Sequence, residues 1–243
     1  RFSEGKEWYE SHFKKCSNGK LRGEFSTSYL YSNEAPERIK AQYPDVKIIV
    51  ILRNPISRAI SQYGKAIKAG EIKEEMTCAE YFETEVSALE QGLYAGQLEP
   101  YFSRFDRSHI LVLIYEDSKK DPQAFIKKIY NFLGVDSLFV PSMLHDEINV
   151  ARVPKHVGVD RGMHYVSEFL RRNGLDTVVH MIRRLGIPDL IRTLNTKPKK
   201  QQKPVVDHTY LVNYFKEDVA RLSTMLDRDL GTEWGIVDTH NSL

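Results

Sequence analysis

An arginine and a serine stand where a buried strand is expected to give way to a helix. The apolar run 47–52 (KIIVIL) is followed by Arg53, then by Asn54 and Pro55, and then by a segment that carries Ser61. In open parallel sheets, ligands bind at the carboxyl ends of the strands. A guanidinium presents a planar fork of N–H donors to a phosphate, and a serine one to two turns into the helix can donate to the same anion. This junction is therefore a candidate anion site.

Spacing alone leaves other interpretations of this junction open. An arginine after a strand often pairs with a carboxylate of its own protein, and a serine on a helix is often merely exposed. Arg58 is a weaker candidate for the anion, because its direction on the helix is not fixed by the sequence. Lys65 follows on the same predicted helix, where it could be a solvated lysine.

Length and composition fit an ordinary globular chain. The 243 residues are 41% apolar and 28% charged, and the net charge is +2. This size allows one large α/β domain or two small ones, and one domain is the simpler interpretation because no internal repeat is present. The near-neutral charge does not indicate a nucleic-acid partner, so an anion site has to be local.

Strand-like runs alternate with helix-like segments in the first 140 residues. A second apolar run lies at 109–115 (HILVLIY). Segments long enough for helices lie at 56–69, 78–91, 97–105 and 121–134. The last of these opens with Asp121-Pro122 and ends at Gly134, which is a typical helix signature. This order predicts a parallel sheet covered by helices, with both strands buried on their two faces.

The C-terminal half is expected to be mostly helical. Residues 161–185 are predicted to form two helices hinged near Gly174, and residues 207–230 a long amphipathic helix. Between them lies the basic, proline-bounded loop 197–204 (KPKKQQKP). Its four lysines could face an anionic ligand or could simply be solvated. The predicted fold class is therefore α/β with a mostly helical C-terminal half.

Cysteine, histidine and hydropathy patterns exclude several classes of protein. Cys16 and Cys78 stand outside any metal-ligand pattern, and two unpaired cysteines are favoured over a single bridge. The eight histidines are dispersed, so no metal site is expected. No apolar run approaches the ~20 residues of a membrane span. The chain opens at Arg1 without an initiator Met or a visible signal peptide, so we expect a fragment of a longer protein.

Residues 52–63 (LRNPISRAISQY) resemble the 3′-phosphate-binding signature of sulfotransferases that use 3′-phosphoadenosine 5′-phosphosulfate (PAPS). The family form is approximately L-R-[DN]-P-x-x-R-A-x-S-x-Y, and this sequence meets it at each fixed position. Segments 23–29 (GEFSTSY), 92–102 (GLYAGQLEPYF) and 110–135 are also similar to the family. The resemblance covers roughly residues 1–140, and it implies that Arg53 and Ser61 contact the 3′-phosphate.

The resemblance also implies a fold and a reaction. The fold would be a P-loop-type parallel sheet, and the reaction would move a sulfuryl group from PAPS to a hydroxyl or amine, leaving 3′,5′-bisphosphoadenosine. A base would take the acceptor proton while cationic groups stabilise the departing bisphosphate. The acceptor would be a carbohydrate or a small metabolite. Lys65 stands where some N-sulfotransferases carry a histidine, so the resemblance also makes it a candidate to approach the acceptor. A basic loop of the family packs over the nucleotide, and Arg152 and Lys155 are the candidates for it here. The location would be cytoplasmic in a bacterium, or the Golgi lumen for a eukaryotic glycan enzyme.

The sequence departs from the family pattern in two places. The P-loop-like G-x-x-K-x-G-T-[TS] is not found, and its lysine and the general base are expected upstream of Arg1. We therefore expect one sulfotransferase-like domain over residues 1–243 that lacks its P-loop strand. Phe25 stands where related glycan enzymes often carry lysine, and Thr27 replaces a proline. Two alternatives remain: an inactive nucleotide- or glycan-binding module of the same fold, and a P-loop phosphotransferase.

Overall fold

A computed structural model describes most of the first 142 residues and the C-terminal helices. The described positions are 4–142 except 18 and 74, then 144, 153–154, 157–172 and 208–237, and isolated residues between 178 and 197. The chain divides into two compact units. The first comprises Arg1–Asn54, Leu93–Val140 and Val212–Leu243, and the second comprises Pro55–Gly92 and Pro141–Leu211. That all 243 residues form one sulfotransferase-like domain stays a prediction.

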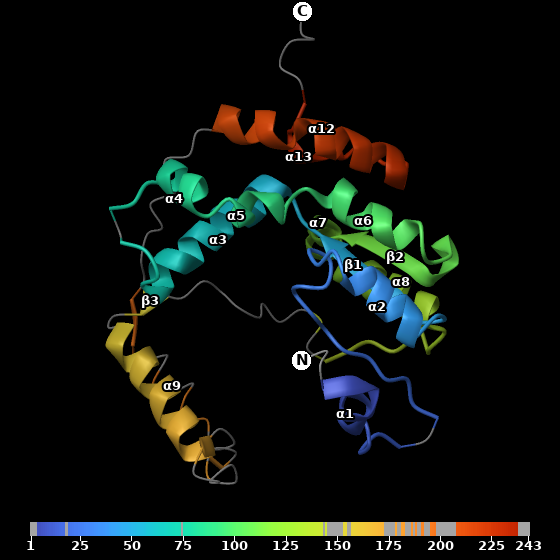
Figure 1. Cartoon of the computed structure of the whole chain (residues 1–243), viewed down its shortest axis with the longest axis horizontal. Helices are drawn as coiled ribbons and strands as arrows, with labels where there is room; N and C mark the ends of the chain where they lie inside the picture. The colour runs from blue at the N-terminus through green and yellow to red at the C-terminus, as the bar shows by residue number, and fades with distance from the viewer. Residues whose placement is uncertain are drawn as a thin grey trace, which may run out of the picture. The chain divides into compact units, whose positions relative to one another are not determined.

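A parallel strand pair forms the centre of the first unit (Figure 1). β1 (Ile48–Leu52) pairs with β2 (Ile110–Ile114), in a register that places Ile48 opposite Ile110 and Leu52 opposite Ile114. Both strands consist of β-branched and leucine residues, which favour the extended backbone. The parallel direction confirms the α/β prediction, and it brings the carboxyl ends of the two strands to the same edge.

One face of this strand pair carries the aromatic core. α6 (Tyr94–Phe102) supplies Tyr101, which packs with Phe105 and Ile110 in one buried cluster. Ile39 of α2 (Ala35–Gln42) packs against the same cluster. The buried hydroxyl of Tyr101 donates to the main-chain oxygen of Tyr29 at 2.9 Å, so its polar end is satisfied. This core holds β2 against the helices that precede it in the chain. The short helix η2 (Arg107–His109) leads into β2.

The other face of the strand pair is more open than the sequence predicted. α7 (Tyr115–Lys120) follows β2 directly and is followed by α8 (Pro122–Leu133). As predicted, Asp121 caps α8 by accepting from the Ala124 N–H at 2.9 Å, and Gly134 ends it with a left-handed φ of 75°. However, no residue of α8 is fully buried, and Ile51 is 48% exposed. The prediction that β1 is buried on both faces is therefore wrong, because only the face of Val50 and Leu52 is closely covered.

The first unit also contains two C-terminal helices and an N-terminal one. α12 (His208–Leu226) contributes the fully buried Phe215, and α13 (Leu230–Trp234) follows it. Asp218 of α12 accepts from the main-chain N–H groups of Ala95 and Gly96, at 3.0 and 3.4 Å. It thereby caps the first turn of α6, although burial raises the pKa of its carboxyl above the ordinary value. α1 (Gly5–Ser11) is a short exposed helix.

The second unit is built around α3 (Pro55–Ala69), and two residues separate its start from the end of β1 in the sequence. The predicted helical segment 78–91 is two helices, α4 (Cys78–Thr84) and α5 (Ser87–Glu90). A capping box of Thr77 and Glu80 starts α4, and the non-helical backbone of Glu85 ends it. α9 (Val157–Arg172) covers the beginning of the predicted helix pair, while Gly174 lies outside the described residues.

Short strands, cysteines and hydropathy complete the description. β3 (Val153–Pro154) and β4 (Thr196–Lys197) form a small antiparallel pair in the second unit. Cys16 is exposed and Cys78 is buried, both are free, and burial raises the pKa of the Cys78 thiol to about 11. The two cysteines are therefore unpaired, as expected. Within the described ranges, no helix has the length and apolar character that crossing a membrane requires.

Candidate functional site

The turn after β1 is held by two hydrogen bonds from Asn54. Its main-chain N–H donates to Oε1 of Glu116 at 3.1 Å, and its side-chain Nδ2 donates to the main-chain oxygen of Trp234 at 3.0 Å. Glu116 belongs to the first turn of α7, directly after β2, and Trp234 ends α13. The carboxyl end of β1 is therefore fastened to two elements that lie far along the chain.

Arg53 occupies this fixed turn without an ion pair in the described part of the chain. Its guanidinium carbon lies 5.4 Å from the centroid of the Tyr115 ring, and the ammonium of Lys119 lies 5.2 Å from the same centroid. Arg53 is half-buried. The sequence left open an ion pair between Arg53 and a carboxylate of the protein, and no such pair is found among the described residues. A half-buried guanidinium without a counter-charge favours an external anion.

The carboxylates that follow β2 are already engaged. Asp117 forms a two-bond ion pair with Arg228, with N–O distances of 2.6 and 2.8 Å. Arg228 also bonds to Glu233, at 2.7 and 2.6 Å. Hydrogen bonds from Arg228 hold the pKa values of Asp117 and Glu233 below their ordinary range, so both stay charged near neutral pH. The single positive charge of Arg228 is therefore shared between two carboxylates.

In the second unit, Arg58 has a structural role. Its Nη1 donates to Oε1 of Gln62 at 2.8 Å and to Oε1 of Gln91 at 3.4 Å. Its Nη2 donates to the main-chain oxygen of Ala88 in a short contact. These bonds join α3 to the end of α5. The sequence left the direction of Arg58 open, and the structure directs it into the protein.

Two further members of the signature lie in the core of the second unit. Ala59 is fully buried, and Tyr63 is only 6% exposed. The Tyr63 hydroxyl donates to the main-chain oxygen of Met76 at 2.6 Å, and its ring centroid lies 5.6 Å from that of Tyr81. Burial raises the pKa of this hydroxyl above the ordinary value. The alanine and tyrosine of the signature therefore position α3, and they are not available to a ligand.

Ser61 and Lys65 lie one turn apart on α3, so they share a face of that helix. Ser61 is half-buried and Lys65 is exposed. Neither has a hydrogen bond or an ion pair with another described residue. The hydroxyl of Ser61 is thus available as a donor on α3, as the predicted phosphate contact requires. The exposed position of Lys65 fits a solvated lysine, and an acceptor-side role for it stays a prediction.

A model of the sulfotransferase domain matches residues 7–153, which is more than half of the chain. The chain belongs to the sulfotransferase domain family. The resemblance carried by residues 52–63 is thereby confirmed at the level of the family.

Curated relatives match in the same part of the chain. Heparan sulfate glucosamine 3-O-sulfotransferase 6 of Homo sapiens is 32% identical over 140 residues, covering 55% of this chain and 41% of the relative. Heparan sulfate glucosamine 3-O-sulfotransferase 3A1 of Mus musculus is 33% identical over 141 residues, covering 55% and 36%. Bifunctional heparan sulfate N-deacetylase/N-sulfotransferase 4 of Mus musculus is 29% identical over 148 residues, covering 55% and 17%. The matches thus span about two fifths or less of these relatives.

A solved structure supports the fold. The crystal structure of a sulfotransferase from Alicyclobacillus acidocaldarius superposes with a TM-score of 0.63 at 24% sequence identity. The match covers 95% of this chain and 74% of that chain. This likeness shows the fold and confirms the predicted α/β class.

Several predicted residues of the sulfotransferase domain are not tested by the structure. Arg152 and Lys155, the candidates for a loop over the nucleotide, lie outside the described residues. So do Lys199, Lys200 and Lys203 of the basic loop. A general base and a P-loop lysine upstream of Arg1 also stay predictions. Of the candidate site, the structure therefore describes Arg53 with its surroundings in the first unit, and Ser61 and Lys65 on α3 in the second unit.

The sequence did not point to the surroundings of Arg53. Tyr115 and the bonds among Asn54, Glu116 and Trp234 were missed, although the Tyr-Glu-Asp triplet after a strand was a usable signal. A second missed cluster surrounds Glu24. Hydrogen bonding to Glu24 raises the pKa of Tyr29, and burial with the nearby charge of Glu24 raises that of Tyr9 to about 12. Phe25, which replaces the family's lysine, is 87% exposed.

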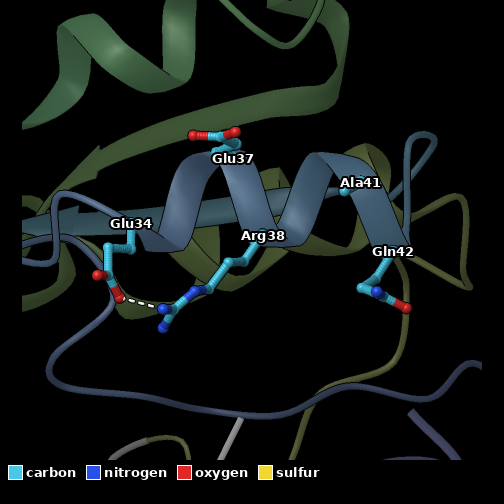
Figure 2. Close-up of a pocket in the computed structure, with 5 residues that line it drawn as sticks. All are labelled: Glu34, Glu37, Arg38, Ala41 and Gln42. Atoms are coloured by element: carbon cyan, nitrogen blue, oxygen red, sulfur yellow. Dashed lines mark ion pairs between the residues drawn. The ribbon is translucent and has the colours of Figure 1, made fainter. Parts of the chain in front are cut away.

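A surface hollow beside α2 lies apart from these residues. It is lined by Glu34, Glu37, Arg38, Ala41 and Gln42, and Figure 2 shows the ion pair between Glu34 and Arg38. All five residues come from α2 or its first cap position. The hollow contains none of the predicted site residues, so we assign it no role in the chemistry.

Proposed function

We propose that the protein transfers a sulfuryl group from PAPS to a hydroxyl or amine of a glycan, with Arg53 and Ser61 binding the 3′-phosphate. The observation that carries the proposal is that some residues of the signature bond inside the protein while, among the described residues, Arg53 and Ser61 do not. Arg58, Ala59 and Tyr63 are engaged in contacts inside the protein. Arg53 and Ser61 have no hydrogen-bond or ion-pair partner in the described part of the chain. They belong to different compact units, so the sequence motif is what supports assigning both to one phosphate.

The available donors fit the group that the family uses. A 3′-phosphate offers only acceptor oxygens, while Arg53 offers a planar fork of N–H groups and Ser61 a single O–H. When bound, PAPS supplies the sulfuryl group together with a stable bisphosphate leaving group. In this proposal Arg53 and Ser61 bind and orient the nucleotide, so their contribution is positional. Arg152 and Lys155 are proposed to cover the nucleotide.

The glycan acceptor is proposed from the relatives. They include a heparan sulfate glucosamine 3-O-sulfotransferase and a bifunctional heparan sulfate N-deacetylase/N-sulfotransferase. Hydroxyl and amine acceptors are therefore both candidates. Phe25 in place of lysine gives the segment after Glu24 a neutral, exposed aromatic group. An acceptor panel should accordingly include neutral glycans and small hydroxyl compounds as well as heparan-type chains.

A transfer assay tests the proposal. Radiolabelled PAPS is offered with the acceptor panel to the wild type and to Arg53→Ala. Loss of a charge-assisted contact of about 1.5–3 kcal/mol is expected to raise KM for PAPS about tenfold to a hundredfold. Ser61→Ala, which removes one donor, is expected to raise it about threefold to tenfold.

Arg107→Ala is the matched control for Arg53→Ala. The Arg107 guanidinium also lies over a ring, 3.8 Å from the centroid of Phe102, but it precedes β2 and is exposed. This variant should leave KM for PAPS unchanged. Equal PAPS-dependent labelling by the wild type and Arg53→Ala would reject the site. Nucleotide binding without transfer to any acceptor would favour the binding-module alternative.

A further inference from the structure

A continuous set of contacts joins Arg228 to the turn that carries Arg53. Arg228 lies between α12 and α13, and its guanidinium bonds both Asp117 of α7 and Glu233 of α13. Each of these two carboxylates is next in the sequence to a residue that accepts a hydrogen bond from Asn54. Glu116 directly precedes Asp117, and Trp234 directly follows Glu233. All of these residues belong to the first compact unit.

The guanidinium of Arg228 is well placed to act as a clamp. It forms two bonds to Asp117 and two to Glu233, all between 2.6 and 2.8 Å. The side chains of Arg228 and Asp117 are only 29% and 22% exposed, so this network is partly shielded from solvent. Such bidentate geometry fixes the relative position of two carboxylates, which a lysine could not do.

Each of the two residues that accept from Asn54 also carries a buried polar atom without a hydrogen-bond partner among the described residues. Oε2 of Glu116 is buried and has no hydrogen-bond partner among the described residues. The same holds for Nε1 of Trp234, whose ring packs edge-on against Tyr94 at a centroid distance of 6.4 Å. The bonds from Asn54 therefore link Glu116 and Trp234 to the end of β1.

We propose that Arg228 is a positioning residue for the 3′-phosphate site. By joining α7 to α13, Arg228 holds Glu116 and Trp234 in the positions from which they accept hydrogen bonds from Asn54. Asn54 in turn fixes the backbone from which Arg53 projects. Arg228 itself does not contact the nucleotide. This inference rests on the proposed function, because it assigns Arg228 to the support of that same phosphate contact.

Replacing Arg228 is expected to weaken recognition of the 3′-phosphate and not to weaken nucleotide binding uniformly. The ratio of the Kd values for adenosine 5′-phosphate and 3′,5′-bisphosphoadenosine measures what the 3′-phosphate contributes. A displaced Arg53 should lower this ratio while the affinity for adenosine 5′-phosphate changes little. A general loss of folded protein would reduce the amount that binds without changing the ratio.

The test compares variants at two arginines of the same C-terminal region by calorimetric titration with both nucleotides. Arg228→Gln is expected to lower the ratio about threefold to tenfold. Arg221→Gln is the control, because Arg221 of α12 pairs with Glu99, and both side chains are more than half exposed. It should leave the ratio unchanged. Glu233→Gln keeps the Arg228–Asp117 pair, and it should lower the ratio in the same direction if Arg228→Gln does not fold.

Each outcome bears on a different claim. If the wild type binds both nucleotides equally, the proposed 3′-phosphate site is wrong. If the wild type discriminates but folded Arg228→Gln and Glu233→Gln keep the full ratio, Arg228 is not a positioning residue. A ratio that falls equally in Arg221→Gln also overturns the inference, because the effect would then belong to charge loss on the C-terminal helices in general.

Discussion

The two ends of the parallel strand pair carry the same kinds of side chain but use them differently. At the amino end, the ammonium of Lys47 donates to the main-chain oxygen of Phe132 at 2.6 Å, and the exposed Arg107 lies over Phe102. At the carboxyl end, Arg53 lies over Tyr115, and the turn behind it is bonded to Glu116 and Trp234.

This difference concerns how each cation is supported. Lys47 donates a hydrogen bond to one of the last carbonyl oxygens of α8, which stabilises the end of that helix. Arg107 is exposed, so its charge is solvated at little cost. Arg53 is half-buried, on an anchored turn, and without a counter-charge in the described residues. An arrangement that is costly for the protein alone, yet held firmly by its neighbours, is typical of a ligand contact.

Arg53→Ala should give the largest effect on this comparison. We expect the Kd for 3′,5′-bisphosphoadenosine to rise about tenfold to a hundredfold, while the free energy of unfolding stays the same or increases. The reason is that the variant removes the proposed phosphate contact together with a half-buried charge that has no counter-charge among the described residues. Titration and denaturant unfolding check the two halves. A large loss of stability would mean that Arg53 is a structural residue after all.

Asn54→Ala should have the next largest effect. It removes the donor to the Trp234 carbonyl but keeps the main-chain bond to Glu116, so we expect a loss of about 1–2 kcal/mol in the free energy of unfolding. The affinity for 3′,5′-bisphosphoadenosine should also fall, because the turn is less fixed. Chemical denaturation and titration measure these changes. An unchanged affinity would show that the turn does not need this support.

Acidification should weaken the carboxyl end selectively. The pKa values of Asp117 and Glu233 are lowered from ordinary values of 3.8 and 4.5 by Arg228. Their contribution is fully present above those ordinary values and is lost as the pH falls through the lower folded values. Stability should therefore decline below about pH 4.5, by roughly 1 kcal/mol for such partly exposed pairs.

The Arg228→Gln variant provides the reference for this acid response. It lacks the partner that lowers the two pKa values, so its unfolding free energy should decline less over the same pH range. Thermal unfolding between pH 6 and pH 3 makes the comparison. An identical pH profile in the variant and the wild type would contradict the assigned cause of the shifts.

Lys47→Met should have the smallest effect, and it should be confined to stability. The variant keeps most of the aliphatic chain beside Phe132 but loses the bond to its carbonyl oxygen, so we expect about 0.5–1 kcal/mol of destabilisation. The affinity for 3′,5′-bisphosphoadenosine should not change. A marked loss of nucleotide affinity would contradict the claim that only the carboxyl end of the strand pair supports nucleotide binding.

Local patterns in the sequence were sufficient for much of the fold. The β-branched runs predicted both strands and their parallel direction, and Asp121 and Gly134 marked the ends of α8. These features depend on a few neighbouring residues. The predicted burial of both faces of β1 failed at Ile51, because burial depends on what other elements cover. The break between α4 and α5 was also missed.

The candidate site was predictable only in part, for a similar reason. The signature identified Arg53 and Ser61 by their types and spacing. Whether each side chain is free depends on distant partners: Asn54 bonds residues 62 and 180 positions away, and Arg58 bonds a carbonyl 30 positions away. No local pattern contains these contacts, so the sequence could not separate the members of the signature that bond inside the protein from those proposed to bind a ligand.

One calorimetric comparison tests the central claim most directly. The wild type and Arg53→Ala are each titrated with 3′,5′-bisphosphoadenosine and with adenosine 5′-phosphate. We predict that the wild type binds the bisphosphate at least about tenfold more tightly, as one charge-assisted phosphate contact would give, and that Arg53→Ala removes most of this difference. Equal binding of the two nucleotides by the wild type, or an unchanged difference in Arg53→Ala, would contradict the account.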